Sequence, residues 1–237
     1  MNPGVILSLV TCHTSLARRH RRAFTLIELM MVVGLIALLV TLLGLSLGDK
    51  GGNSLASAQK MLGSLVGSAR AQAAVNQTEA RILIYGTQPP SGDAEKFLRM
   101  LRVVVAETPG ATSTRWRSVG APVFLPRGVY VVPNPPARFV ASGVIWPVNP
   151  TPVSTLLPAQ VYAIVNEPPG NDSYYAIEWK PDGTVNTALG NQPYAKLAIA
   201  TASLSNSLPA FNNAGAIRGL LIRASGAITF VNDAASF

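Results

Sequence analysis

The hydrophobic and polar positions divide the chain into three regions with different periodicities. Across residues 24–47, apolar residues follow one another almost without interruption, and Glu28 is the only charged residue of the run. As a helix, these 24 residues span about 36 Å, which is enough to cross the hydrocarbon core of a bilayer with some tilt. The run therefore predicts a transmembrane helix over 24–47.

The second region, over 48–78, has the pattern of an amphipathic helix that covers a sheet. Glycines at 44, 48, 51 and 52 precede it, and because each glycine weakens a helix by about 1 kcal/mol, we expect a kink or break there. Ser54 is a suitable cap for the restarting helix. Apolar residues then recur at three- and four-residue steps. The expected buried face is Leu55, Ala58, Leu62, Leu65, Val66, Ala69 and Ala73, and the expected outward face is Ser57, Lys60, Ser64, Ser68 and Arg70.

The third region, over 79–237, is rich in short β-branched and aromatic runs, which indicate strands. Asp182-Gly183 and Ser225-Gly226 are typical of hairpin turns, and seven prolines over 133–158 indicate a long loop. We find no repeat and no second domain, so the predicted fold is α+β, one long N-terminal helix packed on an antiparallel sheet. The expected strands are 80–85, 97–107, 128–132, 161–166, 174–179, 196–201, 216–223 and 227–231.

Composition removes most classes of catalytic site. Cys12, His13 and His20 are the only cysteine and histidines, so residues beyond 20 have neither nucleophilic nor metal-binding Cys/His chemistry. No phosphate-binding loop, dinucleotide fingerprint or hydrolase elbow is present, so we expect no cofactor and no enzyme. Asp172 and Asp182 are candidate calcium ligands, but no ligand-dense loop surrounds them, so we expect no metal site.

The net charge of +8 indicates the orientation of the chain in a membrane more than the binding of an acidic partner. A basic cluster immediately before the apolar run should stay cytoplasmic, which leaves the C-terminal bulk on the other side. The run is too long for the core of a secretory signal. A plain signal anchor is the alternative, but it does not explain Glu28, whose carboxylate costs about 2.5–3.5 kcal/mol within a span. The cluster consists of Arg18, Arg19, Arg21 and Arg22.

The sequence RRAFTLIELMMVVGLIALL closely resembles the N-terminal processing motif of type IV prepilins and type II secretion pseudopilins. In that family a prepilin peptidase cuts on the cytoplasmic side and the new N-terminus is methylated. The resemblance implies a leader over 1–23, a cut between Ala23 and Phe24, and N-methylation of Phe24. Ala23 stands where the family usually has Gly, and both are small. Glu28 becomes the fifth mature residue, and its carboxylate can pair with the Phe24 amine of a neighbouring subunit and set their register.

The tail resembles the H-type (FimT-like) minor pseudopilin domain. The stretches WRSVGAPVFLPRGVYVV, IEWKPDGTV and GLLIRASGAITFV are similar to its Trp…Leu-Pro-Gly-Val, Phe-x-Pro-x-Gly and final Gly hairpin elements. Trp179 stands where Phe is common, whereas Pro181 and Gly183 match. The resemblance thus implies a minor pseudopilin of a type II secretion system, single-pass in the bacterial inner membrane, with 79–237 as a periplasmic domain. Its partners are the prepilin peptidase, other pseudopilins or pilins, and inner-membrane lipid.

Two other functions stay open at this stage. One is a type IV pilus subunit for DNA uptake or adhesion, and the other is a signal-anchored enzyme, which the missing histidines disfavour. For DNA, Arg115 and Arg117 are the candidate contacts, with Trp116 as a base-stacking residue. Because alternate strand residues face opposite ways, Trp116 should not share their face, and a solvated basic surface is the better interpretation. The other basic residues of this region are Arg99, Arg102, Arg127 and Arg138.

Overall fold

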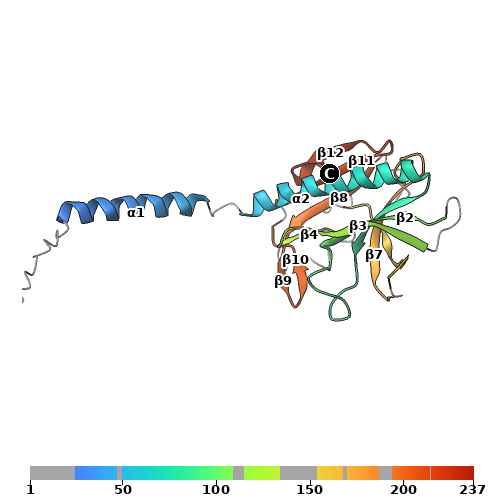
Figure 1. The fold of residues 1–237 in the computed structure, drawn as a ribbon, viewed down its shortest axis with the longest axis horizontal. Helices are drawn as coiled ribbons and strands as arrows, with labels where there is room; N and C mark the ends of the chain where they lie inside the picture. Colours follow the sequence, from blue (N-terminus) through green and yellow to red (C-terminus); the bar gives the residue numbers. More distant parts are fainter. Residues whose placement is uncertain are drawn as a thin grey trace, which may run out of the picture. The chain divides into compact units, whose positions relative to one another are not determined.

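The computed structural model describes residues 25–46, 50–108, 115–133, 154–167, 170–186, 194–213 and 215–237. The chain divides into two compact units, Met1–Gly48 and Asp49–Phe237. The first contains α1 (Leu26–Ser46), and the second begins with α2 (Lys50–Asn76) and continues into a β-rich domain (Figure 1). The α+β class is therefore confirmed.

The first unit consists of α1, whose side chains are described as far as Leu39. Its apolar side chains in that stretch are all exposed, from 77% at Leu26 to 48% at Leu39. Within the described residues, no helix meets the requirements of length and apolarity for a membrane span.

Twelve described strands form three sheets in the second unit. The larger sheet has six strands in the order β5-β7-β1-β2-β3-β6, the smaller has the order β12-β11-β8-β4, and β9 pairs with β10. Apart from the parallel pair β3–β6, neighbours are antiparallel. The strands are β1 Ala80–Tyr85, β2 Met100–Ala106, β3 Arg115–Phe124, β4 Val129–Val131, β5 Leu157–Val161, β6 Ala163–Ile164, β7 Ser173–Trp179, β8 Tyr194–Thr201, β9 Ser203–Ser205, β10 Leu208–Ala210, β11 Ile217–Arg223 and β12 Ile228–Val231, followed by the short helix η2 Ala234–Ser236.

Helix α2 packs on β1 and β2 of the larger sheet and on β8 and β11 of the smaller sheet, and Figure 1 shows it lying along β8 and β11. All seven residues of the expected buried face are buried, from 0% exposed at Ala58 to 9% at Leu65, and the five expected outward residues are exposed. The amphipathic prediction is confirmed. Gln59 is buried as well, and its Nε2 donates to the carbonyls of Gly219 (2.9 Å) and Val231 (2.8 Å), which ties α2 to β11 and β12.

The predicted start of this helix was wrong. Helix α2 begins at Lys50, so Ser54 lies inside it rather than at its cap, and Gly51 and Gly52 are helical. Packing of the apolar face on the sheets outweighs the weak helical preference of two glycines. Gly44 lies within α1, and Gly48 lies outside the described residues.

Both predicted hairpin turns are present, and they lie side by side. Gly183 and Gly226 have φ of +78° and +79°, which only glycine adopts without strain. The side chain of Arg70 on α2 lies against both glycines, and Gly226 also lies against the carbonyl of Gly183. The exposed outward face of α2 thus supplies one contact to the turns.

The sequence analysis missed strands in which apolar and polar residues do not alternate clearly. Strand β3 contains charged, glycine and proline residues and is mostly exposed, so it lacks a clear apolar pattern. Strand β5 includes Leu157 and Pro158, which we expected to be loop; most of that loop, 134–153, lies outside the described residues. The expected strand 161–166 is split, since Tyr162 separates β5 from β6 and Asn166 has φ of +65°.

One segment, 157–164, joins both edges of the larger sheet. Its first part, β5, pairs with β7 (Val161 opposite Ser173), and its second part, β6, pairs with β3 (Ala163 opposite Arg115). The sheet therefore closes on itself through this segment. Strands β1 and β2 are buried on both faces as a result, because α2 covers one face and the closed sheet encloses the other.

Candidate functional site

The first candidate site is the start of α1, where Glu28 forms a reciprocal hydrogen-bonded pair with Thr25. The Thr25 backbone N–H donates to Glu28 Oε2 (3.2 Å), and the Glu28 backbone N–H donates to Thr25 Oγ1 (3.3 Å). The Thr25 hydroxyl also donates to Glu28 Oε2 (3.3 Å). This is a capping box, which satisfies two otherwise unpaired N–H groups and places a negative charge at the positive end of the helix dipole.

Sequence reasoning identified Glu28 as an assembly residue but missed Thr25. The signal was present, since Thr followed three residues later by Glu before an apolar run is the sequence pattern of a capping box. Ala23 and Phe24 lie outside the described residues, so the predicted cut and the predicted amine–carboxylate pair stay predictions. What the structure adds is that the Glu28 carboxylate turns back toward the residue that follows Phe24.

The arginines considered for nucleic acid do not gather on one surface. Arg99 is paired with Glu95 and Arg102 with Glu167, and both arginines are buried. Arg115 and Arg117 are exposed, with Arg115 Nε 3.3 Å from Glu107. The ring of Trp116 is 3% exposed, so it offers no base-stacking face. Arg127 is exposed, and Arg138 lies outside the described residues.

The two aspartates considered for calcium have other partners. Asp172 Oδ1 accepts from the Tyr85 hydroxyl (2.8 Å). Asp182 Oδ1 accepts from the backbone N–H and the hydroxyl of Thr184, and these bonds lower the pKa of the Asp182 carboxyl. Within the described ranges, no three His, Cys, Asp or Glu residues gather in a way that could hold a metal ion.

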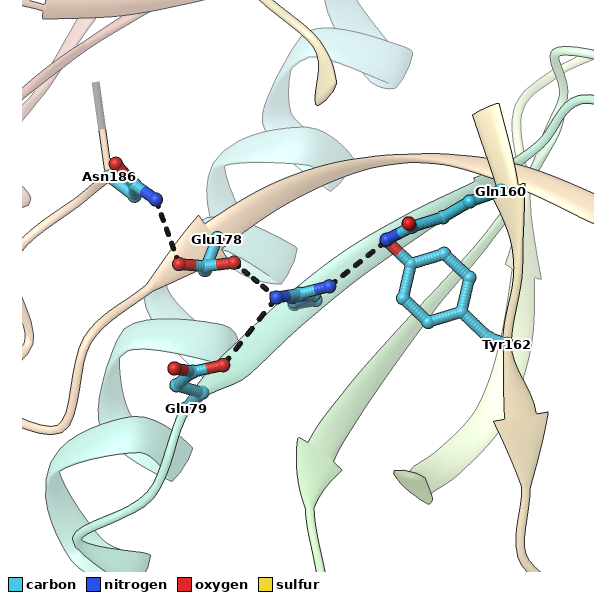
Figure 2. A network of polar contacts seen from close by, with 6 residues as sticks. Glu79, Gln160, Tyr162, Glu178 and Asn186 are labelled. Atoms are coloured by element: carbon cyan, nitrogen blue, oxygen red, sulfur yellow. Dashed lines mark hydrogen bonds and ion pairs between the residues drawn. The ribbon is translucent and has the colours of Figure 1, made fainter. Parts of the chain in front are cut away.

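The most extensive polar network lies inside the closed sheet and is centred on Arg81 of β1. Its guanidinium pairs with Glu178, directly opposite on β7, and with Glu79 at 3.5 Å. Figure 2 shows the surrounding groups: Asn186 donates to Glu178 (2.9 Å), and Gln160 donates to the Tyr162 hydroxyl (2.7 Å).

Aromatic rings enclose the buried arginines. Arg81 lies over the Trp116 ring at 4.4 Å, and Arg102 lies near the Tyr174 ring at 5.9 Å. Edge-to-face contacts link the rings of Trp116, Tyr162, Tyr174 and Tyr85 in that order. We call these six residues the aromatic–arginine cluster. Sequence reasoning missed this cluster because its members lie on β1, β2, β3 and β7 and between β5 and β6, segments that meet only through strand register.

Comparison with known proteins gives one match, which covers α1 and the residues before it. Residues 18–44 match the family described as the prokaryotic N-terminal methylation motif. No curated protein and no solved structure matches the chain. The match includes Ala23, Phe24 and Glu28, and it does not extend into the β-rich domain. The motif supports a type IV prepilin-like protein, the kind of chain that a prepilin peptidase processes.

Proposed function

We propose that the chain is a non-enzymatic filament subunit, and specifically a minor pseudopilin of a type II secretion system. In this proposal, the apolar run over 24–47 holds the subunit in the bacterial inner membrane, and residues 79–237 lie in the periplasm. The methylation motif and the resemblance of the tail to the H-type domain support it. The proposal follows the positive-inside rule, because the arginine cluster precedes the run.

The observation that carries the proposal is the exposed apolar surface of α1. Every apolar side chain from Leu26 to Leu39 that the structure describes is exposed, on all sides of the helix. Apolar surface left in water costs about 25 cal/mol per Å², so a helix of this kind needs a cover. Lipid before assembly and neighbouring helices after assembly supply that cover.

Glu28 has two separable roles in the proposal. The first role is the cap: a Glu28 side-chain oxygen accepts from the Thr25 backbone N–H, and either a carboxylate or an amide can accept this bond. Pairing with the Phe24 amine of a neighbouring subunit needs the negative charge. Cap and charge can therefore be tested apart.

The experiment compares three variants in the native host for processing and for incorporation into filaments. Glu28→Gln keeps a capping side chain and removes the charge, Glu28→Ala removes both, and Thr25→Ala removes the threonine side of the cap. We expect all three to be cleaved, Thr25→Ala to assemble, and both Glu28 variants to fail to the same degree. Normal assembly of Glu28→Gln would show that capping is the whole role of this residue.

A deletion strain separates the secretion function from the pilus function. Loss of secretion of folded periplasmic proteins, with pili intact, is expected for a minor pseudopilin.

Exposed Arg115 and Arg117 leave DNA uptake as the second candidate function. A mobility shift with DNA at low salt that disappears at high salt and in the Arg115→Ala, Arg117→Ala double variant would favour it. Absence of any low-salt shift would end that candidate.

A further inference from the structure

A pocket opens at the end of the closed sheet where β3 and β7 begin. It has a volume of 330 Å³, which is at the lower end of the range for small-ligand sites. Tyr162, Ile164 and Tyr174 form its apolar wall, and Glu167, Asp172 and Arg115 bring charge to it. The pocket lies entirely within the unit Asp49–Phe237, and thus outside α1 and the methylation motif.

Each carboxylate of the pocket has one oxygen committed to an internal partner. Glu167 Oε1 accepts from Arg102 (2.6 Å), and Asp172 Oδ1 accepts from the Tyr85 hydroxyl (2.8 Å). Each of these bonds uses one of the two oxygens of its carboxylate. The second oxygen of each carboxylate, Glu167 Oε2 and Asp172 Oδ2, is therefore the acceptor that we assign to a ligand with N–H donors.

The charge around the pocket is acidic, although the chain as a whole is basic. Counting the charged lining residues with their ion-pair partners, three carboxylates (Glu107, Glu167 and Asp172) stand against two guanidinium groups (Arg102 and Arg115) there. Burial is the main cause that raises the pKa of Tyr174; Arg102 lowers this pKa, and Asp172 and Glu167 each raise it by a smaller amount. A third guanidinium, Arg81, donates to the hydroxyl of the lining Tyr162 (3.3 Å), and it is itself paired with two carboxylates, Glu79 and Glu178.

The one arginine that lines the pocket does not cancel this field. Arg115 is paired with Glu107, and its side chain is 65% exposed, so water and its partner screen its charge. The tyrosine rings show little surface, 8% at Tyr162 and 5% at Tyr174. Such small ring areas suit a single head group better than the flat face of a sugar.

We propose that this pocket binds a primary ammonium group on an alkyl stem, the chemistry of a lysine side chain or a free alkylamine. The ammonium group donates to Asp172 and Glu167, and the stem lies against Tyr162, Tyr174 and Ile164. Tyrosine rings attract cations as well as apolar stems, so both parts of the ligand find a partner.

The test uses the full chain in detergent micelles and saturation-transfer NMR with capped lysine, butylammonium, glucose and acetate as probes. Capped lysine should bind, and Asp172→Asn should weaken it by about tenfold or more, because the amide keeps its bond from Tyr85 but carries no charge. Asp182→Asn is the matched control, since Asp182 is an exposed turn residue whose carboxylate accepts from Thr184 and does not line the pocket, and this variant should bind like the parent chain.

The probes also separate the two sources of the ligand. Tighter binding of capped lysine than of butylammonium assigns the pocket to a protein side chain, and equal binding assigns it to the ammonium group alone; both support the proposal. Equal binding of capped lysine by Asp172→Asn and the parent chain, preference for glucose or acetate, or no binding of either amine would overturn it. Glu167→Gln gives an independent second variant, for which the same loss is expected, should Asp172→Asn fail to fold.

Discussion

Gly219 of β11 is the position where the packing of the smaller sheet can be tested most sharply. A Cβ at this position would lie 2.2 Å from the Leu197 carbonyl oxygen, 2.9 Å from Ala198 Cα and 2.6 Å from Phe237 Cζ. The Phe237 ring can move, but Leu197 and Ala198 are backbone of β8, an inner strand of that sheet. Gly219→Ala therefore forces β8 and β11 apart.

The expected cost follows from the kind of contact. Overpacking a filled core costs about 1–3 kcal/mol, and contact with backbone puts Gly219→Ala at the upper end, about 2–3 kcal/mol. For a domain of this size, each kcal/mol lowers Tm by about 2–4 °C. We expect Tm to fall by about 4–12 °C.

Gly67→Ala is the matched control. Gly67 lies in α2, is exposed, and a Cβ there meets nothing within 4 Å. The same change should raise stability by about 1 kcal/mol, because alanine is the better helix former. Thermal unfolding of both variants, followed by near-UV circular dichroism on the full chain in detergent, gives shifts of opposite sign. An unchanged Tm for Gly219→Ala would refute the close approach of β8, β11 and the C-terminal ring.

Three further predictions concern buried polar groups. Arg81→Met should destabilise the domain by about 3–5 kcal/mol in denaturant unfolding, because it leaves the Glu178 carboxylate buried without its ion pair, and a loss under 1 kcal/mol would contradict the network. Gln59→Leu should cost about 1–3 kcal/mol by the same assay, since two hydrogen bonds to sheet carbonyls are lost; no cost would mean that α2 is not held there. Burial raises the pKa of Tyr174, so the unfolded chain loses this proton first, and the free energy of unfolding should fall above about pH 10. Burial lowers the pKa of Lys196, so this residue alone makes the free energy of unfolding rise with pH up to about pH 10.5. Tyr174→Phe should reduce the loss of stability at alkaline pH.

The sequence predicted the elements whose periodicity is set by one buried face. Helix α2 packs on two sheets with a single stripe, so spacing alone identified Leu55 to Ala73 as its core. Strand β1 was predicted with its correct bounds because it is a short run of apolar residues between polar ones. The glycine turns at 183 and 226 were predicted because a positive φ there requires glycine.

The closure of the larger sheet could not be predicted, for a physical reason. A strand of two residues, β6, has no periodicity to read, and its pairing with β3 depends on where the rest of the sheet places Arg115. Arg102 looked like surface charge in the sequence, since nothing local shows that it will meet Glu167 across the closed sheet. The pocket follows from that closure and was equally hidden.

The central claim is that the chain is processed and assembled as a prepilin, and mass spectrometry of the protein from the membranes of its native host tests this most directly. The account predicts a mature chain that begins at Phe24 and carries an N-methyl group. A chain that retains Ala23 and the arginine cluster, or an unmodified N-terminus at any other residue, would contradict it.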